Sequence, residues 1–209
     1  MSGPTGGLTG WALDVMDALG APGAGLLIAA ENLFPPLPSE VFLPLAGFAA
    51  SRGGIGLGAA ILFTTLGSLV GALALYFLGA RLGEERLRAL ADRIPLLDSS
   101  DVDRTSRWFD RHGGKAVFFG RMLPVFRSLI SIPAGVHRMP LWRFVLLTGS
   151  GSLIWNSAFV LAGYALGQNW HLIEGYAQVF EYGVLGVAAL ALTWFVVRRI
   201  RAKKKSPVT

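Results

Sequence analysis

The chain has 209 residues, of which 53% are hydrophobic and only 15% are charged, and its mean hydropathy is +0.52. Soluble domains carry about 25% charged residues, so this composition disfavours an ordinary water-soluble enzyme. The net charge of +6 comes from the C-terminal tail at 198–209, because the basic residues at 198–205 leave the rest of the chain neutral. A basic tail differs from the basic face of a nucleic-acid-binding protein, and we therefore expect no nucleic-acid partner.

In chain order, the first candidate for a membrane-crossing helix is 11–30, which is weakened by Asp14 and Asp17 near its start. Residues 55–80 and 144–170 carry no charge, and each exceeds the roughly 20 apolar residues that cross a ~30 Å hydrocarbon core. A further uncharged segment, 182–197, ends at the basic tail. We therefore predict an all-α polytopic membrane protein with about four transmembrane helices.

Two further apolar segments, at about 31–50 and 116–137, are interrupted by prolines. Proline breaks a continuous helix, and neither segment is long enough to cross the membrane and return. Each therefore fits a re-entrant hairpin of two half-helices that enters and leaves on the same side. Irregular backbone at membrane depth is tolerated only where protein or a cavity surrounds it.

The hydrophilic stretch 81–115 separates the hairpins and carries eight basic and seven acidic residues. Its apolar spacing predicts two short amphipathic helices at the membrane interface, the second from about Ser100 to Gly113–Gly114. Basic residues gather on the cytoplasmic side, which places this loop, the basic tail and both termini in the cytoplasm. The first hairpin then opens outward and the second inward, an inverted-repeat-like topology within a single membrane domain at 1–197.

Four charged residues remain in apolar surroundings: Glu31, Glu40, Arg121 and Arg127. Each costs about 2.5 kcal/mol or more at the membrane centre, so these side chains should face a cavity or one another. The arginines fit either a structural ion pair or a binding site for an anionic phosphate, which a guanidinium holds through its planar fork of donors. The carboxylates fit either ion pairing and helix capping or a proton-coupling site, since burial disfavours and a nearby arginine favours their charged form.

Other polar residues at membrane depth give weaker signals. Ser39, Ser128, Ser131 and Asn156 are candidates for secondary polar contacts with a substrate, although such groups more often join helices. The chain has no cysteine, and its three histidines match no zinc pattern. We therefore expect no metal, no cofactor and no catalytic residue, and so a protein that is not an enzyme.

The motifs around the four charges resemble those of the DedA family, the bacterial branch of the SNARE-associated or VTT-domain membrane proteins. The likeness rests on Glu31-Asn32, on PPLPSE at 35–40 and LPLAGF at 43–48, and most specifically on GRMLPVFRSLISIPAG at 120–135. It implies an inner-membrane protein with two opposed re-entrant hairpins that depends on the proton-motive force. The resemblance also implies that Glu31 and Glu40 correspond to the essential acidic pair of the family, and Arg121 and Arg127 to its essential arginines. Some members carry the second acid farther from the first.

The leading hypothesis is a flippase that returns undecaprenyl phosphate to the inner leaflet of the bacterial inner membrane. Its phosphate would bind Arg121 and Arg127, and Glu31 or Glu40 would exchange a proton. The first alternative moves phosphatidylethanolamine or phospholipids in general, as a flippase or scramblase, and the second is a proton-coupled antiporter for cations or drugs. The expected partners are polyprenyl phosphate or phospholipid, membrane lipids and protons, and a homo-oligomer stays open.

Overall fold

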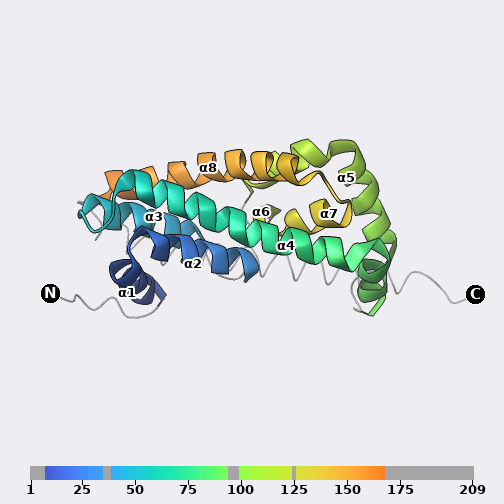
Figure 1. Ribbon diagram of the computed structural model, residues 1–209, viewed down its shortest axis with the longest axis horizontal. Helices are drawn as coiled ribbons and strands as arrows, with labels where there is room; N and C mark the ends of the chain where they lie inside the picture. The colour runs from blue at the N-terminus through green and yellow to red at the C-terminus, as the bar shows by residue number, and fades with distance from the viewer. Residues whose placement is uncertain (1–7, 35–38, 94–98, 124–125, 168–209) are drawn as a thin grey trace, which may run out of the picture.

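The computed structural model of the chain describes residues 8–34, 39–93, 99–123 and 126–167. These residues form eight α-helices and no strand, and they build an elongated molecule (Figure 1). The predicted all-α fold is therefore confirmed for the part of the chain that is described. The predicted span at 182–197 and the basic tail at 198–209 lie outside the described residues.

The first two helices, α1 (Leu8–Leu19) and α2 (Ala21–Leu33), meet at a break on Gly20. Gly20 has a φ of 65°, a left-handed conformation that glycine adopts at no steric cost, and Pro22 lies in the first turn of α2. The prediction of one transmembrane helix over 11–30 is therefore wrong, since neither helix alone is long enough to cross a membrane.

The predicted cytoplasmic position of the N-terminus depended on that crossing. Helix α1 packs against α2 at the same end of the molecule as residues 52–56, which follow the first hairpin (Figure 1). This is the end that the charge distribution assigned to the outside. The structure therefore gives no support to a cytoplasmic start of the chain.

The first hairpin consists of α2 and α3 (Ser39–Ser51), which contact each other on either side of the proline-rich segment 35–38. Its arms cover 21–33 and 39–51, so it begins at 21 rather than at the predicted 31. The reason is the break at Gly20, which frees the whole of α2 to act as the first arm. Pro44 lies inside α3 without ending it.

The predicted span at 55–80 is the first part of α4 (Leu57–Arg93). This helix is interrupted at Gly83, whose φ of 65° and ψ of 172° are not helical. Helix α5 (Ser99–Gly120) then runs through Gly113 and Gly114, so the predicted end of a helix at these two glycines is wrong. A Cβ added to Gly114 would lie 2.7 Å from Nη2 of Arg143, which shows that this glycine makes room for a neighbouring side chain.

The second hairpin enters on the last turns of α5 and returns on two short helices, α6 (Phe126–Leu129) and α7 (Ser131–Val136). It occupies the predicted 116–137, but its first arm is continuous with the helix that begins at Ser99. The predicted span at 144–170 is α8 (Leu141–Ala165). Helices α4 and α8 contact each other and run in opposite directions (Figure 1).

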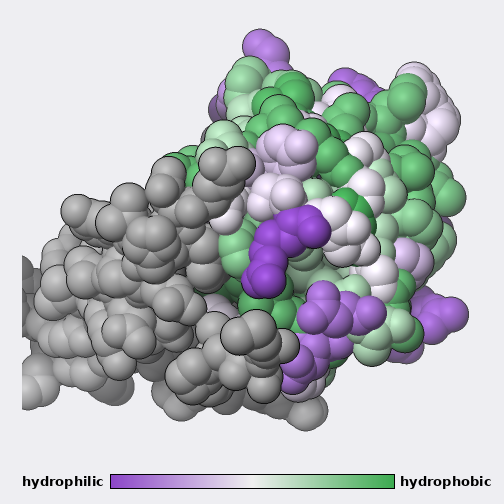
Figure 2. All heavy atoms as spheres, turned by 90° about the vertical axis from the view of Figure 1, so that its left-hand side faces the viewer, coloured by the Kyte–Doolittle hydropathy of each residue, from purple (hydrophilic) through white to green (hydrophobic). Residues whose placement is uncertain are grey.

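Helices α4 and α8 are long and apolar enough to cross a membrane. Their outward faces expose large apolar side chains, unlike the polar outer face of a water-soluble helix. Leu62 and Val70 on α4, and Leu146 and Ile154 on α8, are more than half exposed. The buried faces carry polar side chains beside apolar ones, among them Thr64, Ser68, Thr148, Ser152 and Asn156. Seen end-on, apolar residues cover much of the sides of the described part (Figure 2). Such a surface suits lipid rather than water.

The two long helices share a sequence pattern. Thr, Gly, Ser and Leu occur with the same spacing in both helices, at Thr64, Gly67, Ser68 and Leu69 and again at Thr148, Gly151, Ser152 and Leu153. Because α4 and α8 run in opposite directions, the repeat is inverted in space. This pattern supports the inverted-repeat-like arrangement that the topology predicted.

The short helices pack on the long ones in the same repeated way. In each of two helix pairs, one glycine on either helix faces the backbone of the other helix. These glycines are Gly47 and Gly163 between α3 and α8, and Gly135 and Gly79 between α7 and α4. Helix α2 also packs on α4 through Gly25 and Gly67. Small residues at such contacts allow helix backbones to approach closely inside a membrane. The close approach fixes where the hairpin tips lie.

We predict that Gly67→Ala destabilises the protein, because the added Cβ would collide with the backbone carbonyl of Gly25. The expected loss in the free energy of unfolding is about 2 kcal/mol, typical of overpacking. Gly58→Ala is the matched control in the first turn of the same helix, since nothing lies within 4 Å of the added Cβ there, and it should not lower the free energy of unfolding. Unfolding of the two detergent-purified variants measures the difference, and equal stability would contradict the packing described.

Candidate functional site

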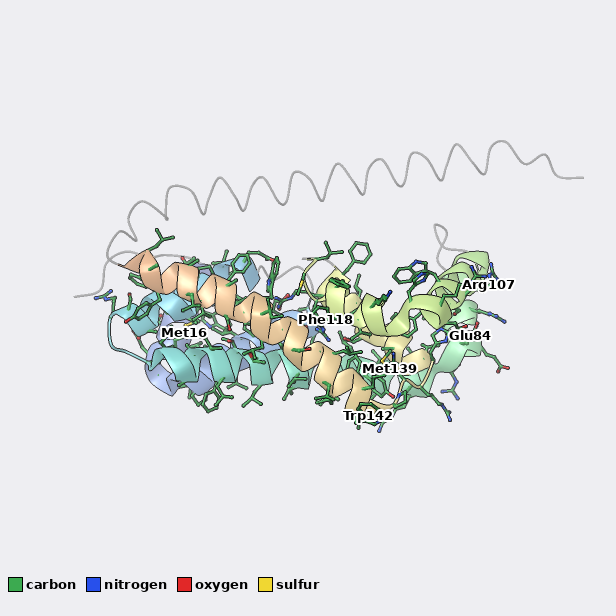
Figure 3. All side chains as sticks on the ribbon, turned by 90° about the horizontal axis from the view of Figure 1, so that it is seen from above. Met16, Glu84, Arg107, Phe118, Met139 and Trp142 are labelled. Atoms are coloured by element: carbon green, nitrogen blue, oxygen red, sulfur yellow. The ribbon has the colours of Figure 1, made fainter. Side chains whose placement is uncertain are left out.

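The tips of the two hairpins meet at a buried ion pair. Glu31, in the last turns of α2, accepts a hydrogen bond from Nη2 of Arg127 in α6, and both side chains are almost completely buried. Phe118, three residues before Arg121, lies midway along the molecule between Met16 and Arg107 (Figure 3). The site is therefore near the middle of the long axis, far from either end.

Arg121 lies beside this pair, in the turn that follows α5. Its Nη2 donates to Oγ of Ser131 at 2.8 Å, and its Nη1 donates to Oδ1 of Asn32 at 3.5 Å, the longer and weaker of the two bonds. The side chain is 2% exposed. Gly151 on α8 gives it room, since a Cβ there would lie 3.0 Å from Cβ of Arg121.

Asn32 joins the two hairpins through the hydrogen bonds of its uncharged amide. Its Nδ2 donates to the carbonyl of Ile28 at 3.0 Å, and its Oδ1 accepts from Oγ of Ser128 at 3.2 Å as well as from Arg121. Asn32 is fully buried, and a Cβ on Gly71 of α4 would lie 2.5 Å from its own Cβ. The absence of a side chain at Gly71 therefore lets α4 pack directly over the amide.

The charges of this cluster do not cancel. Glu31 pairs with Arg127, whereas both hydrogen-bond partners of Arg121 are neutral oxygens. Nε of Arg121 is also buried without a hydrogen-bond partner among the described residues. Buried charges are normally paired, because removing an ion from water is costly. The three side chains thus carry an excess positive charge that an anion would neutralise.

Other predicted site residues make no hydrogen bond to this cluster among the residues described. Glu40, in the first turn of α3, is partly buried and within electrostatic reach of Glu31, but it makes no hydrogen bond or ion pair with the residues described. Asn156 donates to Oγ of Ser68 at 3.2 Å, which joins α8 to α4. Ser39 begins α3, and its side chain lies outside the described part.

Asn32 is the residue of the cluster that the sequence did not single out. A neutral amide carries no charge to mark it as unusual in an apolar segment, and its signals are its place directly after Glu31 and its part in the Glu31-Asn32 motif. Among the described residues, no three His, Cys, Asp or Glu side chains lie close enough together to hold a metal ion. The polar groups of the cluster are guanidinium, carboxylate, hydroxyl and amide groups.

The VTT domain model matches residues 37–165, more than half of the chain. The chain belongs to the VTT-domain family. Undecaprenyl phosphate transporter A of Staphylococcus aureus is 33% identical over 183 residues, 86% of this chain and 90% of that protein. DedA of Escherichia coli is 25% identical over 174 residues, 82% of this chain and 78% of that protein. The resemblance to the DedA family is therefore confirmed.

Another relative of this VTT-domain protein bears a different kind of name. The alkaline phosphatase-like protein of Lactococcus lactis subsp. cremoris is 40% identical over 202 residues, 93% of this chain and 94% of that protein. No solved structure matches the chain. Its relatives include proteins named as transporters, and the expectation that it is not an enzyme stays a prediction.

We predict that Glu31 and Arg127 stabilise the fold only when both are present. Glu31→Gln and Arg127→Gln should each lower the free energy of unfolding by about 3 kcal/mol, because each leaves a buried charge without its partner. The double variant should lose less than the sum of the two by about 1 kcal/mol or more. Unfolding of the three detergent-purified variants measures this coupling, and strictly additive losses would show that the two side chains do not interact.

Proposed function

We propose that this protein is a lipid transporter of the bacterial inner membrane that moves undecaprenyl phosphate from the outer to the inner leaflet. The observation that carries the proposal is the buried Arg121, whose hydrogen-bond partners are all neutral. A polyprenyl phosphate is a lipid whose headgroup is an anion, so it supplies the missing negative charge. The relatives named undecaprenyl phosphate transporter A support this choice of substrate.

The proposed path places the phosphate where the hairpin tips meet and leaves the polyprenyl tail in the surrounding lipid. We take the two hairpins to be re-entrant, within one membrane domain at 1–197 whose basic tail is cytoplasmic. The apolar outer faces of α4 and α8 suit the lipid tail, and the guanidinium fork suits the phosphate oxygens. Each half of the inverted repeat then lines one side of the path.

Proton coupling fits the ion pair at the site. While Arg127 is paired with the Glu31 carboxylate, its charge is neutralised and it attracts a phosphate less strongly. Protonation of Glu31 would release Arg127 to the substrate, and loss of the phosphate would return it to the carboxylate. The charge of Glu40, close to Glu31, disfavours a second negative charge there. We therefore assign proton exchange to Glu31, with Glu40 as its modulator.

Two other substrates and one other reaction class compete with this proposal. A phosphatidylethanolamine or general phospholipid flippase would need a partner for the ammonium group, which Glu31 provides only if it leaves Arg127. A proton-coupled cation or drug antiporter would place a cation beside the excess positive charge of Arg121. The name of the Lactococcus lactis relative raises phosphate-ester hydrolysis, which a release assay for inorganic phosphate detects.

We predict that Arg127→Ala abolishes transport of undecaprenyl phosphate into the inner leaflet of proteoliposomes. Arg127→Lys should retain about a tenth of the wild-type rate or less, because lysine keeps the charge but loses the planar fork. Arg107→Lys, an exposed position on α5 far from the site (Figure 3), is the matched control and should transport at the wild-type rate. Full activity of Arg127→Lys would rule out bidentate phosphate binding at this position.

A further inference from the structure

The two arginines of the site have different partners, although the sequence presents them as a matched pair. Arg127 is bound to the carboxylate of Glu31. Arg121 is bound to the hydroxyl of Ser131 and the amide oxygen of Asn32, neither of which carries a charge. Only one of the two guanidinium charges is thus compensated within the cluster.

Asn32 is held in one orientation from three directions. Its Nδ2 is committed to the carbonyl of Ile28, so its Oδ1 is the atom that faces the second hairpin. That oxygen accepts from Arg121 and from Ser128. Helix α4 packs directly against the side chain at Gly71 and so encloses it on that side. Asn32 therefore offers Arg121 an acceptor without offering it a counter-charge.

We propose that Arg121 is the permanent anion-binding group of the site, that Asn32 positions it without neutralising it, and that Arg127 is a second anion-binding group released by protonation of Glu31. This inference rests on the proposed function and divides its roles among the residues. It assigns constant attraction for phosphate to Arg121 and the dependence on pH to Arg127. The charged groups near Glu31 are Arg127 on α6, Arg121 after α5 and Glu40 on α3.

An aspartate at position 32 would have nearly the same shape as asparagine but a negative charge. In that place it would pair with Arg121 and remove the excess positive charge of the cluster. An alanine at the same position would remove the acceptor and leave the charge of Arg121 intact. The two substitutions therefore separate a role in charge from a role in packing, since aspartate is the better mimic of asparagine in shape.

The test measures binding of undecaprenyl phosphate to the full-length protein in lipid nanodiscs, with uncharged undecaprenol as the control lipid. We expect Asn32→Asp to weaken phosphate binding about tenfold to a hundredfold, and to weaken it more than Asn32→Ala does. Thermal unfolding of both variants shows whether they are folded. If Asn32→Ala binds more weakly than Asn32→Asp, Asn32 acts through packing and this inference is overturned.

The arginines are compared in the same assay at one pH below neutrality and one above it. Each variant is expressed relative to wild type at the same pH, so that titration of the lipid phosphate cancels. Arg121→Gln should lose binding at both pH values, whereas Arg127→Gln should lose the extra binding that wild type gains at the lower pH. Glu31→Gln should bind strongly at both. Identical profiles for the two arginine variants would overturn the division of roles.

The same measurements separate a failure of this inference from a failure of the proposed function. If the wild-type protein binds undecaprenyl phosphate no better than undecaprenol, the proposed function is wrong and the inference falls with it. If the wild type prefers the phosphate but the order of the position-32 variants is reversed, only the inference is wrong.

Discussion

A charge buried at the centre of a membrane protein is costly unless an opposite charge neutralises it, and the meeting of the two hairpin tips in this molecule reflects that constraint. Glu31 and Arg127 come from different hairpins and neutralise each other where the hairpin tips meet. Arg121 is buried in the same place with neutral partners only. The fold thus tolerates one uncompensated positive charge at its centre, an arrangement that costs stability unless an anion is present. That cost is the physical basis for assigning an anionic substrate.

The close packing of the helices makes this arrangement rigid. Glycines let α2 and α7 approach α4, and let α3 approach α8, so that backbones rather than side chains are in contact. The same pattern of glycines occurs in both halves, on long helices that run in opposite directions. The hairpin tips therefore meet at the centre because each hairpin is fixed along a long helix.

Much of this architecture follows from the sequence, and the exceptions have specific causes. The spans at 55–80 and 144–170 were predictable because uncharged segments of that length have few other structures, and Glu31, Arg121 and Arg127 were predictable because a charge in such surroundings is costly. The helix break at Gly20 was missed because hydropathy alone does not report a left-handed turn. Gly113 and Gly114 resembled a helix end, but tertiary packing against Arg143 explains them. The different partners of the two arginines could not be predicted, because they depend on contacts between residues that lie 89 and 96 positions apart in the sequence.

Recognition of a lipid whose phosphate headgroup is anionic, rather than zwitterionic, can be measured in a flip assay. The full-length protein is reconstituted into vesicles, and the movement of undecaprenyl phosphate and of phosphatidylethanolamine between leaflets is measured side by side, at two pH values. We expect undecaprenyl phosphate to move faster than phosphatidylethanolamine, at a rate that changes with pH. Equal rates for the two lipids at both pH values would contradict it.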